Sequence, residues 1–237
     1  MAESPPANSE NRPNGYVKIE VKEVRSIPLP GGDSGEGLGL VTDRGVIPGI
    51  LHSVDESSKA VIWVCGARGG FGGPGSGLYE QLAQQFTAQG ITSLRLDYRV
   101  PNDLPECAVD LMAGVTYLED TGHDPVVVVG HSFGGAVVIA AAAVSRHVSG
   151  VVSLSPQTYG ANMAGLISPR PVLIVHGKED TRLPYSCGMQ VYEWANEPKK
   201  LVLYDGAEHR LEECKQELAT LLTEWIPETL NREPDAL

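Results

Sequence analysis

The sequence predicts an α/β protein whose mostly parallel, eight-stranded sheet carries helices on both faces. From residue 59 onward, short apolar runs alternate with segments of helical periodicity, which is the pattern of strand-helix-strand units. Two of these runs, KAVIWVCG at 59–66 and PVVVVG at 125–130, are almost continuously apolar, as expected for strands buried on both faces of a parallel sheet. Only a short connection separates Ser155 from Pro171, so we expect no large lid domain.

The N-terminal part predicts a different, antiparallel arrangement. Residues 16–29 alternate partly between apolar and polar side chains, which is typical of a half-exposed strand. The segment PGGDSGEGLG at 30–39 is interpreted as a glycine-rich turn, and residues 45–54 as the second strand of an antiparallel pair. Residues 1–15 have neither a basic nor an apolar leader segment, so we expect a disordered tail there.

The other elements follow from periodicity and from helix-ending residues. In the first expected helix, for example, Leu78, Leu82 and Phe86 recur at helical spacing, and Gly90 is suited to end it. Helices are predicted at 77–90, 104–122, 132–146, 185–197 and 211–226. Further strands are predicted at 91–99, 148–155, 169–177 and 199–206. Successive parallel strands are expected to be joined by right-handed crossovers.

Length and composition limit the domain count and the class of partner. The 237 residues suit one α/β domain, predicted at 16–228, with a C-terminal tail at 229–237. The formal net charge is −12, and a surface of that sign repels phosphate backbones and anionic lipid, so neither nucleic acid nor a membrane is expected as a partner. The four cysteines and six histidines lack metal-binding spacing. We therefore expect a cytoplasmic protein with no metal site and no disulfide framework.

One strand-to-helix junction carries a candidate nucleophile. Ser132 lies in the segment Gly130-His131-Ser132-Phe133-Gly134, between the VVVV strand and an alanine-rich helix. A serine on such a sharp turn is presented at the carboxyl edge of the sheet, and flanking glycines let strand and helix pass closely. The first backbone N–H groups of the helix point to the same place, which suits a developing oxyanion. The alternative interpretation is a glycine-rich turn with a serine cap.

Two later strands end near the groups that a serine nucleophile needs. Asp180 and His209 each follow a predicted strand, and the carboxyl ends of parallel strands meet at one edge of a sheet. We therefore expect His209 to act as the base for Ser132 and Asp180 to orient His209. Glu179 and Asp205 are the alternatives for the acid. The other histidines are interpreted as structural or incidental; they are His52, His123, His131, His147 and His176.

Six segments between residues 61 and 211 carry a family resemblance. They are VIWVCGARGGFGGPGSGLY, LRLDYR, VVVVGHSFGG, SLSP, HGKEDTRLP and GAEHRL. The chain resembles the α/β-hydrolase superfamily, and within it the lidless, dienelactone-hydrolase-like serine hydrolases. The resemblance implies cleavage of a small-molecule ester through an acyl-serine intermediate, without metal or organic cofactor. It also implies that the backbone N–H groups of Phe133 and of Ala67, or of Arg68 instead, bind the oxyanion.

The resemblance leaves the exact activity open. Dienelactone hydrolases proper use a cysteine nucleophile, whereas this chain has Ser132. The same triad serves esters, thioesters and amides, and hydrolase scaffolds also serve non-catalytic binding proteins. Because no large lid domain is expected, the substrate pocket should be open, which favours short to medium acyl esters. The residues expected to line this pocket are Arg68, Phe71, Tyr98, Tyr159 and Met163.

A second motif favours a different class of enzyme. Gly70, Gly72 and Gly75 match GxGxxG between a predicted strand and a predicted helix, and Asp97 ends the next strand where a ribose-binding acid would lie. This pattern is typical of a nicotinamide-dependent oxidoreductase. Against it, Pro74 and additional glycines lengthen the turn beyond a tight pyrophosphate cradle, and the motif leaves the serine, aspartate and histidine unexplained.

Overall fold

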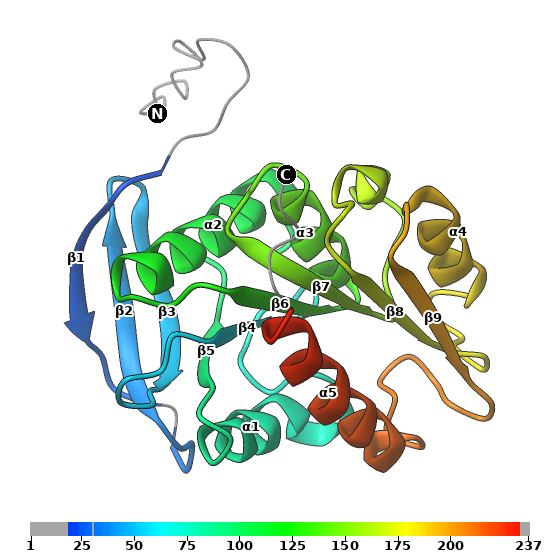
Figure 1. The fold of residues 1–237 in the computed structure, drawn as a ribbon, viewed down its shortest axis with the longest axis horizontal. Coiled ribbons are helices and arrows are strands. Elements are labelled where there is room, and N and C mark those ends of the chain that lie inside the picture. Colours follow the sequence, from blue (N-terminus) through cyan, green and yellow to red (C-terminus); the bar gives the residue numbers. More distant parts are fainter. Residues whose placement is uncertain (1–18, 30, 233–237) are drawn as a thin grey trace, which may run out of the picture.

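The computed structural model describes residues 19–29 and 31–232, so the tail expected at 1–15 lies outside the described residues. Nine strands form one sheet in the order β1-β2-β3-β5-β4-β6-β7-β8-β9 (Figure 1). The strands are β1 (Val21–Ser26), β2 (Glu36–Thr42), β3 (Gly45–His52), β4 (Ala60–Val64), β5 (Thr92–Leu96), β6 (Val126–His131), β7 (Val148–Leu154), β8 (Val172–Gly177) and β9 (Lys199–Tyr204). All pairings from β5 through β9 are parallel, which confirms the predicted fold class.

Helices cover both faces of the sheet, as predicted. They are α1 (Pro74–Thr87), α2 (Leu104–Asp120), α3 (Phe133–Ala142), α4 (Ser186–Trp194) and α5 (Lys215–Leu230), with a 3₁₀ turn η1 (Ala164–Leu166) between β7 and β8. Figure 1 shows α1 and α5 on one face and α2, α3 and α4 on the other. The C-terminal tail was expected from residue 229, but α5 includes residues 229 and 230, which are buried. Residues 233–237 lie outside the described part of the chain.

Two apolar cores sandwich the central strands. Along β6, Val126 and Val128 belong to the core under α2 and α3, whereas Val127 and Val129 belong to the core under α1 and α5. Because side chains alternate between the faces of a strand, an uninterrupted run of valine serves both cores at once. The strand is thereby held rigidly at the centre of the sheet, and so is the residue that follows it.

The prediction of eight strands was wrong by one, in the glycine-rich segment at 30–39. The structure places β2 at Glu36–Thr42, between β1 and β3, so the two N-terminal strands expected to pair with each other pair with β2 instead. A Cβ atom on Gly37 would lie 2.0 Å from the carbonyl oxygen of Ile27. Gly37 is therefore a strand residue against which another backbone packs directly, and not a turn residue.

None of the helices within residues 19–29 and 31–232 combines the length and the apolar composition that spanning a lipid bilayer requires.

Candidate active site

Ser132 occupies the turn between β6 and α3. Its φ is 59° and its ψ is −119°, a left-handed backbone conformation that is rare outside glycine and is found at strained functional turns. The Ser132 amide donates to the carbonyl oxygen of Leu154 in β7 at 2.8 Å, which holds the turn against the neighbouring strand. The serine side chain is partly exposed, although His131 before it and Phe133 after it are buried. The fold therefore presents the hydroxyl at the carboxyl edge of the sheet.

Two glycines make this turn sterically feasible. A Cβ atom on Gly130 would lie 2.0 Å from the carbonyl oxygen of Gly134, and one on Gly134 would lie 2.2 Å from the carbonyl oxygen of Cys65. Real Cβ atoms do not approach backbone oxygens so closely, so no other residue fits without moving the backbone. The spacing of glycines around the serine thus follows from the contact of α3 with β6 and with the end of β4.

Ser132, His209 and Asp180 lie in one chain of hydrogen-bond contacts. Nε2 of His209 is 2.9 Å from Oγ of Ser132, and Nδ1 of His209 is 2.7 Å from Oδ2 of Asp180. The His209 and Asp180 side chains are buried. Each of the three residues follows a different parallel strand, namely β6, β8 or β9, and those strands end at the same edge of the sheet. The distances and the order of contacts match a nucleophile, a base and an acid that orients the base.

The two alternative acids lie elsewhere. Asp205 is exposed and pairs with Nζ of Lys178 at 2.6 Å. Glu179 is exposed, and its backbone amide donates to the carbonyl oxygen of Ala207 at 3.0 Å. That backbone contact ties the loop after β8 to the loop after β9, so it stabilises the arrangement in which Asp180 meets His209.

The carboxylate of Asp180 is fully engaged. Oδ1 accepts hydrogen bonds from the backbone amides of Arg182 at 2.9 Å and Leu183 at 2.8 Å, while Oδ2 faces His209 and lies 3.0 Å from Nε2 of His176. Burial opposes ionisation of Asp180, but the Leu183 amide and His209 favour it, and on balance the pKa of Asp180 lies below its ordinary value. The carboxylate is thus charged and cannot rotate without breaking two backbone hydrogen bonds.

Two buried histidines that contact these residues were missed by sequence reasoning. Nε2 of His131 is 2.8 Å from the carbonyl oxygen of His209, and His176 contacts Asp180. Burial lowers the pKa of both, that of His131 to about 4, so both rings are neutral at pH 7. The available signal was position, because His131 directly precedes Ser132 and His176 lies at the end of β8.

The loop after β4 lies beside Ser132. A Cβ atom on Gly66 would be 3.4 Å from Cβ of Ser132. The next two residues, Ala67 and Arg68, are exposed, and no protein acceptor is found within residues 19–29 and 31–232 for the Ala67 amide. Phe133 is the first residue of α3, so its amide has no partner within the helix. Two backbone N–H groups that could bind an oxyanion therefore flank Ser132, in the segments predicted from the sequence.

Asp97, the acid of the apparent dinucleotide-binding motif, accepts hydrogen bonds from backbone amides of this chain. Oδ1 of Asp97 accepts hydrogen bonds from the backbone amides of Gly70 at 2.7 Å and Tyr98 at 2.8 Å. The Gly75 amide donates to the carbonyl oxygen of Arg210, in the loop that carries His209. These contacts shape the glycine-rich loop next to the serine and use one oxygen of the Asp97 carboxylate within the protein.

The residues predicted to form a pocket divide into two groups. Tyr98 is buried beneath the loop after β4, where its hydroxyl donates to the carbonyl oxygen of Cys65 at 2.9 Å and its ring meets the Phe133 ring edge-on. Phe71 is partly exposed in the same loop, which also carries the exposed Arg68. All three thus lie in the loop after β4 or pack against it, and this loop approaches Ser132 at Gly66.

Tyr159 and Met163 lie in a different hollow. It has a volume of about 630 Å³, and its other walls include Leu104 of α2, Ala140 of α3 and Trp194 of α4. None of Ser132, Asp180 and His209 lines it. The structure thus does not bring these two predicted pocket residues together with the three polar ones.

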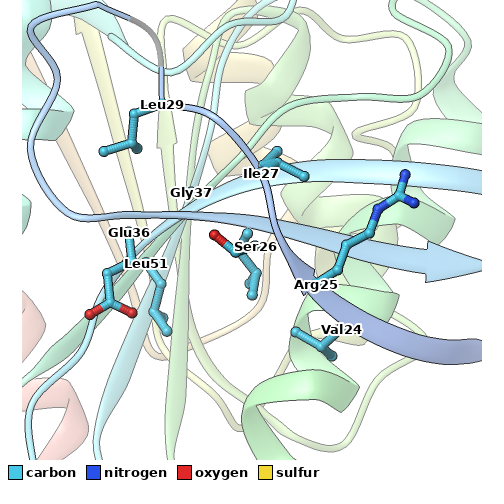
Figure 2. Close-up of a pocket in the computed structure, with 9 residues that line it drawn as sticks. Val24, Arg25, Ser26, Ile27, Leu29, Glu36, Gly37 and Leu51 are labelled. Carbon is cyan, nitrogen blue, oxygen red and sulfur yellow. The ribbon is translucent and has the colours of Figure 1, made fainter.

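A second surface groove lies at the far end of the sheet. It has a volume of about 460 Å³ and runs along β1 and β2, as Figure 2 shows, with Glu36 and Leu51 towards one end and Val24 and Arg25 towards the other. Strands β6, β8 and β9, which precede the three polar residues, occupy the other half of the sheet order. The groove is therefore separate from the candidate active site.

Solved structures share the fold at low sequence identity. The α/β hydrolase GrgF from Penicillium sp. sh18 is 18% identical, with a TM-score of 0.70 over 89% of this chain and 98% of that one. Est1E from Butyrivibrio proteoclasticus is 19% identical, with a TM-score of 0.69 over 84% of this chain and all of that one. A dienelactone hydrolase from Anabaena variabilis is 20% identical, with a TM-score of 0.69 over 90% of this chain and 100% of that one. At these identities the likeness shows a common fold.

Sequence comparison supplies the family. The uncharacterized protein YfhR from Escherichia coli is 40% identical over 50 residues, which are 21% of this chain and 18% of that protein. The match thus spans less than a fifth of that relative's length. Residues 61–234, most of the chain, match the model of the alpha/beta hydrolase family. The chain therefore belongs to the alpha/beta hydrolase family.

Proposed function

We propose that this protein is a serine hydrolase that cleaves carboxylic esters with short to medium acyl groups through an acyl-serine intermediate. The observation that carries the proposal is the continuous contact from Oγ of Ser132 to Nε2 of His209, and from Nδ1 of His209 to Oδ2 of Asp180. A serine hydroxyl is a weak nucleophile unless a base removes its proton and a third group orients that base. Ser132, His209 and Asp180 supply these three groups, and each lies within hydrogen-bond distance of the next.

The reaction begins when Nε2 of His209 takes the Ser132 proton as Oγ attacks the ester carbonyl. Asp180 keeps the hydrogen of His209 on Nδ1, which leaves Nε2 free to accept, and it stabilises the imidazolium that forms. The carbonyl oxygen becomes an oxyanion, which the Phe133 and Ala67 amides bind. Each such donor is worth on the order of 10²–10³ in rate. Collapse of this intermediate releases the alcohol, which takes the proton from His209.

The second half of the reaction repeats the same chemistry with water. His209 takes a proton from water as the water oxygen attacks the acyl-serine carbonyl, and the proton then passes to Oγ of Ser132 as the acid leaves. Every proton transfer uses groups that this chain supplies, so the proposed reaction calls for no metal and no organic cofactor.

The choice of an ester substrate has indirect support. A dienelactone hydrolase and an esterase domain from a Rhodothermus marinus protein, which by their names act on a lactone and on esters, both share the fold. The connection between β7 and β8 contains only the short turn η1 (Ala164–Leu166) as an intervening element, so this connection forms no large domain over the partly exposed Ser132. An uncovered nucleophile suits small acyl groups that need no deep enclosure.

Two measurements test the proposal. A fluorophosphonate probe should label the wild-type protein at Ser132 and should not label the variant S132A, because only an activated serine reacts quickly. The wild-type protein should hydrolyse nitrophenyl esters of rising acyl length. The S132A variant should keep the fold, but its kcat should be lower by about 10⁶-fold. A correctly folded wild-type protein that is neither labelled nor active on esters, thioesters or amides would refute the enzymatic proposal. Activity on thioesters or amides alone would refute only the assignment of an ester as the substrate.

A further inference from the structure

We propose that His176 is a positioning residue for the candidate triad: its neutral imidazole donates to the same oxygen of Asp180 that faces His209. The inference rests on the proposed serine hydrolase function and adds a member to its machinery. Nε2 of His176 is 3.0 Å from Oδ2 of Asp180, and Nδ1 of His209 is 2.7 Å from that oxygen. One carboxylate oxygen thus lies between two imidazole rings.

The location of the His176 hydrogen follows from its second contact. Nε2 of His176 also lies 3.0 Å from the carbonyl oxygen of Leu183. A carbonyl oxygen can only accept, and an ionised carboxylate can only accept, so the nitrogen between them must carry the hydrogen. His176 is therefore a donor shared between Leu183 and Asp180, and its tautomer is determined by geometry.

The other edge of the ring shows why His176 stays in this orientation. Nδ1 of His176 is buried without a hydrogen-bond partner among the described residues. The ring packs against Gly188 of α4, where an added Cβ atom would lie 2.7 Å from Nδ1. The side chain is fully buried. A flipped ring would abandon both acceptors, so the packing of α4 and the two contacts at Nε2 select one arrangement.

His176 acts on the triad through Asp180. The Arg182 and Leu183 amides hold Oδ1, and His176 holds Oδ2, so the oxygen that orients His209 is fixed from its other side. A hydrogen bond from His176 also draws electron density from Oδ2. The titratable groups that act on His176 are Asp180 and His209. Without the donor, we expect Oδ2 to move more freely and to attract the charged form of His209 more strongly.

The test compares H176F, which removes the donor, with H176Q, whose amide nitrogen has about the same reach as Nε2. For H176F we expect kcat for a nitrophenyl ester to fall about 10–100-fold, the range seen when groups that orient metal-binding histidines are removed. KM should be nearly unchanged, because His176 does not reach the substrate. The acidic limb of the kcat/KM profile should move to higher pH. H176Q should recover most of kcat and the wild-type pH profile.

A matched control separates positioning from packing. His123 is a partly buried histidine whose Nε2 contacts Oγ1 of Thr92 at 3.0 Å, remote from the triad. The pair H123F and H123Q should change stability without moving the pH profile. If H176F keeps the wild-type pH profile and kcat, or if H176Q is impaired as strongly as H176F, the inference is wrong. In either case an active, labelled wild-type protein leaves the proposed function standing.

A measurement on folded protein covers the case in which H176F does not fold. Long-range ¹H–¹⁵N correlation spectra of the S132A protein at neutral pH should show His176 with its hydrogen on Nε2. A hydrogen on Nδ1, or a charged ring, would overturn the inference whether or not the protein hydrolyses esters.

Discussion

Ser132 and His209 are separated by 77 positions in the chain, yet Oγ of the serine lies 2.9 Å from Nε2 of the histidine. The contact exists because β6 and β9 end at the same edge of the parallel part of the sheet. The backbone amide of Thr181 reinforces it by donating to Oε2 of Glu208 at 3.0 Å, which joins the loop of Asp180 to the loop of His209. The candidate site is thus held by rigid strands and by contacts between its loops.

The role of Asp180 can be tested with D180N. Asparagine keeps an oxygen for the Arg182 and Leu183 amides, but it presents an NH₂ group to His209 and so favours the wrong tautomer. We expect kcat to fall about 10⁴-fold with the fold intact, following the same change in serine proteases. Nitrophenyl ester hydrolysis measures the effect, and D205N, at an exposed acid that pairs with Lys178, is the control. If both variants kept wild-type activity, Asp180 would not be the acid of the triad.

Because the turn around Ser132 is tightly packed, we expect G134A to lower the stability of the protein strongly. The added Cβ atom would lie 2.2 Å from the carbonyl oxygen of Cys65, which belongs to the backbone and cannot simply rotate away. We expect the free energy of unfolding to fall by about 3 kcal/mol, the upper end of the usual cost of overpacking. Urea denaturation measures it, with G31A as the control because no atom lies within 4 Å of the corresponding position. Equal stability of the two variants would contradict the close approach of α3 to the end of β4.

Because His131 is buried, we expect the free energy of unfolding to depend on pH. An unfolded histidine takes up a proton near pH 6.5, whereas burial lowers the pKa of folded His131 to about 4. Between these values the unfolded chain holds more protons, so the free energy of unfolding falls as the pH is lowered. The total loss is roughly 3 kcal/mol, since one unit of pKa corresponds to about 1.4 kcal/mol.

Denaturation curves of wild type and H131Q between pH 7 and pH 4 test this expectation. The variant should lose less stability over that range, because its side chain does not titrate. A slope remains in both proteins, because burial and the nearby Arg95 also lower the pKa of His52 to about 4. Identical slopes for the two proteins would show that His131 does not contribute.

We expect Asp97 to shape the glycine-rich loop next to Ser132. In D97A the backbone amides of Gly70 and Tyr98 lose their shared acceptor, and an unsatisfied buried donor costs about 1–3 kcal/mol. We expect lower stability and faster proteolysis of the loop after β4. A titration with a nicotinamide cofactor should show no binding to wild type. Saturable binding that D97A abolished would instead support the oxidoreductase interpretation.

Local pattern was sufficient for much of the fold. The strands from β4 onward and the helices α1 to α5 were predicted because each can be recognised within a few residues, through an apolar run or a helical repeat. Strand β2 was not predicted, because its segment is rich in glycine and glycine-rich segments are typical of turns. What makes Gly37 a strand residue is the approach of Ile27, and composition does not encode that contact.

The sequence by itself determined Ser132, Asp180 and His209 as candidates for the proposed chemistry, since each follows a strand that can be recognised from its own apolar run. Only the tertiary structure decided their partners: Asp180 rather than Asp205 faces His209, and His131 and His176 contact the same site. It also placed Tyr159 and Met163 in a separate hollow. The physical reason is that hydrogen bonds between strand ends depend on the order of strands in the sheet and on loop packing. Neither leaves a signal in the spacing of residues along the chain.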